Sequence, residues 1–120
     1  MTVSGPSFLS LQVRDLTVSA DFYESQLGLV RAPQAPPGAV VFTTSPIPFA
    51  VRSPAAGTDL DSGRPGLGVA LWLACNDAAA LHESLAAAGV TIVTPPFDGP
   101  FGKTFVLRDP DGYDVTLHSS

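Results

Sequence analysis

The chain has 120 residues, of which 45% are hydrophobic and only 14% are charged. This length indicates a single domain, and the hydrophobic fraction excludes a disordered chain. Eleven acidic and six basic residues give a formal net charge of −5. Because the basic residues are scattered along the chain, we expect no nucleic-acid-binding surface. The low density of charged residues indicates that a partner subunit covers part of the apolar surface.

Cysteine usage and hydropathy indicate the compartment. Cys75 is the only cysteine, so no internal disulfide can form and nothing points to an oxidising environment. No apolar stretch is long enough to span a membrane, and the first residues lack the basic and apolar regions of a signal peptide. We therefore expect a soluble cytoplasmic protein.

The first half of the chain predicts a strand, a helix and two further strands. Apolar and polar residues alternate at the start, and Asp15 and Gly28 are typical of the beginning and the end of a helix. The expected elements are a strand at 8–13, a helix at 15–28, a proline-rich loop at 32–38 and strands at 40–44 and 49–52.

The second half repeats this order after a segment rich in Gly, Pro, Ser and Asp. Asp77 is a helix cap and Gly89 closes the helix, with Leu81 and Leu85 facing inward. The expected elements are a linker at 53–68, a strand at 69–75, a helix at 77–89, a strand at 90–93, a loop at 95–103, and a hairpin of strands 104–108 and 113–118 around a turn at 109–112.

The two halves indicate an internal duplication. Gly28 lies thirteen residues after Asp15, and Gly89 lies twelve residues after Asp77. We therefore expect one domain, 1–120, made of module 8–52 and module 69–118 joined by linker 53–68. Each module is too small to bury both faces of its own sheet, so two modules or two chains must share a core.

Two motifs connect the chain to a known family. Residues 13–29 contain V-R-D-L-x-x-S-x-x-F-Y followed by L-G-L, and residues 105–113 read F-V-L-R-D-P-D-G-Y. With these motifs, the chain from Phe8 to His118 resembles the vicinal oxygen chelate superfamily, which includes glyoxalase I, extradiol dioxygenases, fosfomycin-resistance enzymes and bleomycin-resistance proteins. The resemblance implies an α+β fold of two βαβββ modules, whose curled mixed sheets surround a cleft and pair in a homodimer. It does not imply one chemistry, because this fold hosts many activities.

The resemblance also implies where a metal ion would be held. Enzymes of the superfamily bind a divalent metal through His, Gln or Glu at cleft-facing strand positions. The matching positions here are Phe8, seven residues before Asp15, and Ala70, seven before Asp77, together with Thr116. A benzyl ring, a methyl group and one neutral hydroxyl do not hold a divalent cation. We therefore expect no metal and no cofactor.

Strand alternation extends this assignment to a set of cleft-facing side chains. Trp72 falls on the same side as Ala70, where it can stack on a ligand or serve as a core residue. Arg52 can meet an anionic group or a surface carboxylate, and Phe101, with Phe97, can act as a lid or anchor its loop. The candidate ligand-binding residues are Phe8, Ser10, Gln12, Arg52, Ala70, Trp72, Phe101, Thr116 and His118. We interpret Cys75 as buried and inert and His82 as solvent-facing.

These residues predict a metal-free homodimeric protein of the bleomycin-resistance type. It would bind an aromatic or hydrophobic small molecule, such as an antibiotic, and would bind neither nucleic acid nor membrane. Two alternatives remain open. One is a glyoxalase-like lyase, isomerase or dioxygenase with an atypical metal site or none, in which Asp114 or His118 could be a general base. The other is a module that has lost its ligand and associates with another protein.

Overall fold

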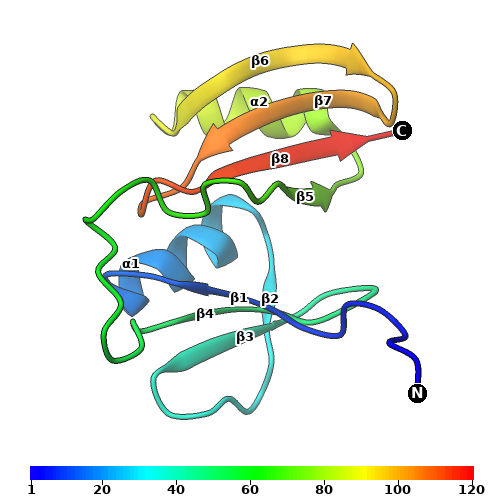
Figure 1. Cartoon of the computed structure of the whole chain (residues 1–120). Helices are drawn as coiled ribbons and strands as arrows, with labels where there is room; N and C mark the ends of the chain where they lie inside the picture. The colour runs from blue at the N-terminus through cyan, green and yellow to red at the C-terminus, as the bar shows by residue number, and fades with distance from the viewer. The chain divides into compact units, whose positions relative to one another are not determined.

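The computed structural model describes all 120 residues and divides into two compact units, Met1–Leu60 and Asp61–Ser120. Each unit combines one helical segment with one four-stranded mixed sheet, so the fold is α+β with two modules, as predicted (Figure 1). Neither helix is long and apolar enough to cross a membrane.

The first unit is a short helical segment packed on a sheet of order β1-β4-β3-β2, in which β1 and β4 are parallel. Its helix begins where the sequence predicts, because the Asp15 side chain accepts a hydrogen bond from the Val18 amide at 3.1 Å. The elements are β1 (Leu9–Gln12), α1 (Leu16–Asp21), the π-helical η1 (Phe22–Gln26), β2 (Val30–Arg31), β3 (Ala39–Thr43) and β4 (Phe49–Arg52).

Three aromatic rings form the centre of the first unit's core. The Tyr23 ring of η1 lies with its centroid 5.0 Å from that of Phe49, and Phe42 stacks on Phe49 at 6.0 Å. All three side chains are almost completely buried. The face of the sheet that carries Phe42 and Phe49 is therefore the face that packs under the helical segment.

The second unit has the corresponding sheet order, β5-β8-β7-β6, with β5 and β8 parallel. Asp77 caps its helix by accepting a hydrogen bond from the Ala80 amide at 3.0 Å. Leu85 is fully buried, as predicted, whereas Leu81 is half-buried. The elements are β5 (Leu71–Ala74), α2 (Ala78–Ala87), β6 (Thr91–Gly99), β7 (Gly102–Arg108) and β8 (Asp114–Ser119).

The predicted loop at 95–103 is wrong. Strand β6 continues through Pro95 and Pro96, and β7 begins at Gly102, so only Pro100 and Phe101 lie between the two strands. Because β6 is an edge strand, a residue without an amide hydrogen costs no ladder hydrogen bond when it faces outward. The pairing also shifts register between Thr94 and Phe97, which accommodates both prolines.

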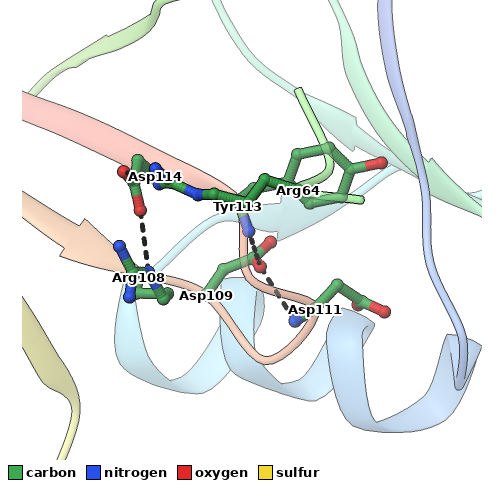
Figure 2. Close-up of polar contacts among 6 residues, drawn as sticks. All are labelled: Arg64, Arg108, Asp109, Asp111, Tyr113 and Asp114. Atoms are coloured by element: carbon green, nitrogen blue, oxygen red, sulfur yellow. Dashed lines mark hydrogen bonds and ion pairs between the residues drawn. The ribbon is translucent and has the colours of Figure 1, made fainter. Parts of the chain in front are cut away.

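The connection between β7 and β8 is a turn organised by one carboxylate. Asp109 Oδ1 accepts hydrogen bonds from the amides of Asp111 and Tyr113, both at 2.9 Å (Figure 2). The Gly112 amide donates to the Asp109 carbonyl at 3.1 Å. These contacts are those of an Asx-stabilised turn, so the D-P-D-G motif has a structural role here.

Candidate ligand-binding site

The second sheet has one helix-covered face and one face without a helix. Phe105, Val115 and Leu117 point toward α2 and are at most 2% exposed. The alternate residues of β5 and β8 lie on the other face, where Trp72 pairs with Thr116 and Ala74 with His118. The predicted strand alternation is therefore correct for this sheet.

His82 is not the solvent-facing side chain that the sequence suggested. Its ring lies 5.4 Å from the Phe105 ring in an edge-to-face arrangement, and the residue is half-buried. His82 is thus part of the packing between α2 and its sheet. His118 is the histidine that lies on the helix-free face.

Three rings gather on this helix-free face, and we call Trp72, Phe101 and His118 the aromatic cluster. The Trp72 ring lies edge to face with both others, 5.8 Å from Phe101 and 5.6 Å from His118. The Phe101 and His118 centroids are 6.4 Å apart. Trp72 is 43% exposed and Phe101 63% exposed, so the cluster presents ring surface outward instead of filling a core.

A surface hollow of about 360 Å³ adjoins the aromatic cluster and shares two of its residues. Its volume lies at the lower end of the range of small-molecule sites. The lining residues are Ala74, Cys75, Pro100, Phe101, Gly102, His118, Ser119 and Ser120. Of this set, the sequence predicts only Phe101 and His118 as ligand-binding residues. Pro100 lies beside them because the turn between β6 and β7 is short, whereas the sequence predicts a long loop there.

Cys75 lies at the wall of the hollow and is half-buried rather than buried. Its Sγ is 3.5 Å from the carbonyl oxygen of His118, to which it donates. Burial raises the pKa of the Cys75 thiol above its ordinary value. A protonated thiol is a poor nucleophile, which agrees with the inert role that the sequence suggested.

Asp114 is held by two arginines and is a weak base. Its Oδ1 accepts from Arg108 Nε at 2.9 Å, and its Oδ2 from Arg64 Nη2 at 2.7 Å (Figure 2). The hydrogen bond from Arg108, supported by the positive charges of both arginines, holds the pKa of Asp114 below its ordinary value. This arrangement stabilises the ionised carboxylate and does not favour proton abstraction.

The candidate residues of the first sheet lie on its own helix-free face. Ser10 and Gln12 alternate with the residues that face the helical segment, and Gln12 pairs with Arg52 across the parallel strands. Gln12 Oε1 accepts from the Ala55 amide at 2.7 Å, and Arg52 Nε donates to the Ser53 carbonyl at 2.9 Å. Both side chains therefore contact the segment that follows β4. Phe8 precedes β1 and is 51% exposed.

The residues at the superfamily's metal-ligand positions do not fit a metal ion. Phe8 and Ala70 carry no donor atom, and Thr116 carries one neutral hydroxyl on the helix-free face of the second sheet. No group of three His, Cys, Asp or Glu side chains in the structure is placed to hold a metal ion. No chemical step can be derived through a metal from this donor set.

Comparison with known proteins identifies a family for nearly the whole chain. The family model described as Glyoxalase/Bleomycin resistance protein/Dioxygenase superfamily matches residues 5–117. A search of curated proteins found no match.

Solved structures with the same fold include binding proteins and enzymes. TnmS3, an antibiotic binding protein from Streptomyces sp. CB03234, is 22% identical with a TM-score of 0.76, over 99% of this chain and 98% of that chain. A glyoxalase/bleomycin resistance protein from Albidiferax ferrireducens T118 is 26% identical with a TM-score of 0.76, over 96% and 98%. Lactoylglutathione lyase from Agrobacterium tumefaciens is 19% identical with a TM-score of 0.68, over 100% and 96%.

Proposed function

Since the chain belongs to the Glyoxalase/Bleomycin resistance protein/Dioxygenase superfamily, we propose that it binds an aromatic or hydrophobic small molecule without a metal ion and releases it unchanged. In this proposal the protein is a cytoplasmic homodimer whose ligands include antibiotics. The similarity in fold to an antibiotic binding protein supports this class of ligand. A lyase has the same fold, so the fold alone does not distinguish binding from catalysis, and the residues of the site must carry that argument.

The exposed aromatic cluster is the observation that carries the proposal. A strand tryptophan that faced α2 would be a core residue, whereas Trp72 lies on the opposite face and is 43% exposed. Its contacts with Phe101 and His118 hold the indole in place before a ligand arrives, which lowers the entropic cost of binding. Aromatic ligands gain both buried apolar area and favourable ring geometry against such a surface.

The donor set supports binding rather than turnover. The metal-ligand positions carry Phe8, Ala70 and Thr116, and the ionised carboxylate of Asp114 is paired with two arginines. The Thr116 hydroxyl lies beside Trp72 on the neighbouring strand and supplies a polar contact for a ligand. Of the other candidate residues, Ala70 belongs to the same unit as the aromatic cluster. Phe8, Ser10, Gln12 and Arg52 belong to the first unit, and their part in ligand binding stays a prediction from the sequence.

Calorimetric titration of chelator-treated protein tests this function. We expect saturable binding of naphthalene-type probes and of aromatic antibiotics, with the ligand recovered chemically unchanged. Trp72→Ala should weaken binding by about tenfold or more, since ring contacts of this kind contribute on the order of 1 kcal/mol in addition to buried area. Leu67→Ala is the matched control, because Leu67 is an 80% exposed apolar side chain of the same unit outside the cluster.

Two results would contradict the proposal. One is a stoichiometric metal in untagged protein together with conversion of the ligand. The other is equal affinity in wild type and Trp72→Ala. The dimer is tested separately, by a molar mass in solution near twice 12.4 kDa.

A further inference from the structure

The hydrogen bond between His118 and the turn at Phe101 determines which ring nitrogen remains available. His118 Nδ1 lies 3.2 Å from the carbonyl oxygen of Phe101. A carbonyl oxygen only accepts, so Nδ1 must carry the hydrogen in this contact. In the neutral ring the other nitrogen, Nε2, then has a free lone pair and acts as an acceptor. No hydrogen bond of the structure engages His118 Nε2.

The surroundings of His118 make this acceptor distinctive. The rings of Trp72 and Phe101 lie against it, and Ala74 is its register partner on β5. The thiol of Cys75 is occupied with the His118 carbonyl. The Thr116 hydroxyl, two residues away on β8, can both donate and accept, so it does not discriminate between ligands. Within the aromatic cluster, Nε2 of His118 is thus the side-chain atom that only accepts.

We infer that His118 determines the specificity of the proposed binding site by accepting a hydrogen bond from the ligand at Nε2. The inference rests on the proposed function and names its ligand class, aromatic molecules that carry an N–H or O–H donor on the ring edge. A ligand without this donor covers the Nε2 lone pair and removes it from water without a replacement partner. A site built around a polar group rejects the analogue that leaves this group unpaired.

A pair of probes that differ in one hydrogen-bond donor tests the inference. 2-Naphthol and 2-methoxynaphthalene share the ring system, but only the first has an O–H group. At about pH 8, where histidine side chains are generally neutral, we expect wild-type protein to bind the naphthol about tenfold more tightly than the ether. His118→Phe should keep the ring and bind both probes with equal affinity. His82→Phe, the same substitution at the histidine that packs between α2 and its sheet, is the matched control and should keep the preference.

A second measurement does not depend on a variant. A long-range ¹H–¹⁵N spectrum of the imidazoles should show the Nδ1–H tautomer for His118, with His82 as the only other histidine. The Nε2 resonance should shift on addition of the naphthol and not of the ether.

The outcomes separate this inference from the proposed function. If both probes bind wild type equally, or if His118→Phe retains the preference, the role of His118 is wrong although the protein still binds aromatic ligands. If neither probe binds at all, the proposed function fails and the inference fails with it.

Discussion

The indole of Trp72 lies edge to face against the Phe101 ring, with the centroids 5.8 Å apart and the ring planes at 85°. This contact joins β5 to the two-residue turn between β6 and β7. It makes one surface from segments that are distant in sequence. We therefore expect a ligand that binds this surface to contact both the turn and β5.

Phe101→Ala should weaken binding of an aromatic probe by about tenfold while leaving the fold intact. The loss follows from removal of one ring of the aromatic cluster, and the fold is spared because Phe101 is 63% exposed. Calorimetric titration measures the affinity, and circular dichroism checks the fold. Unchanged affinity in Phe101→Ala would show that the ring does not contact the ligand.

Much of the fold follows from local sequence signals. Asp15 and Asp77 cap their helices because their carboxylates satisfy free amides of the first turn, a signal readable from residue type and spacing. The alternation of side chains along the strand around Trp72 also predicts correctly that Trp72 lies on the sheet face opposite the helix. These signals depend on neighbours in sequence, so one sequence is sufficient to interpret them.

Other features depend on the position of an element within the sheet. Pro95 and Pro96 suggested a loop, yet they are compatible with β6 because this strand lies at an edge. The contact of His82 with Phe105 likewise depends on how α2 lies on its sheet. The hollow beside Phe101 includes the two-residue turn between β6 and β7, together with residues at the ends of β5 and β8. None of these has a local sequence signature.

Alanine substitutions of glycines in the segment before β5 should separate the cost of a positive φ from the cost of a steric contact. Gly66 has φ +73°, and a Cβ added there would lie 3.0 Å from the Tyr113 ring. Gly66→Ala should therefore lower the free energy of unfolding by more than about 1 kcal/mol, the approximate cost of the left-handed conformation alone.

Two neighbouring glycines are the controls for this prediction. Gly68 has φ +86° but no heavy atom within 4 Å of an added Cβ, so Gly68→Ala should show only the conformational cost. Gly63 has neither feature, and Gly63→Ala should be close to neutral. Urea unfolding measures all three, and equal losses in Gly66→Ala and Gly68→Ala would argue against the contact with Tyr113.

Asp114→Asn should destabilise the protein at neutral pH and much less in acid. The pKa of Asp114 is lowered in the folded protein, chiefly by the hydrogen bond from Arg108. A depressed folded-state pKa contributes stability above the unfolded-state pKa, and this contribution is lost as the pH falls through the folded-state pKa. The difference in the free energy of unfolding between wild type and Asp114→Asn should therefore shrink once the pH falls below 3.8, the ordinary pKa of an aspartate side chain.

The control for this pH dependence is Asp98→Asn. Asp98 pairs with Lys103 at 2.7 Å, but its side chain is 87% exposed. An exposed ion pair contributes little, so this variant should unfold like wild type at every pH. Thermal unfolding followed by circular dichroism measures both variants. A destabilisation of Asp114→Asn that persists unchanged in strong acid would contradict the assignment.

Cys75 should react slowly with iodoacetamide in the folded protein and faster after unfolding in denaturant. Burial raises the pKa of its thiol, so less of the reactive thiolate is present near neutral pH. Because Cys75 also lines the hollow, an aromatic probe should slow the reaction further in wild type but not in Trp72→Ala. Mass spectrometry follows the alkylation. Equal rates with and without a saturating probe would place the ligand elsewhere.

The single tryptophan permits a direct measurement on the site itself. A ¹H–¹⁵N correlation spectrum of chelator-treated protein contains one indole N–H signal, that of Trp72. During titration with 2-naphthol this signal should move and saturate at the calorimetric stoichiometry, without added metal. A signal that stays in place under chelation and moves only when a divalent metal is supplied would contradict metal-free binding at the aromatic cluster.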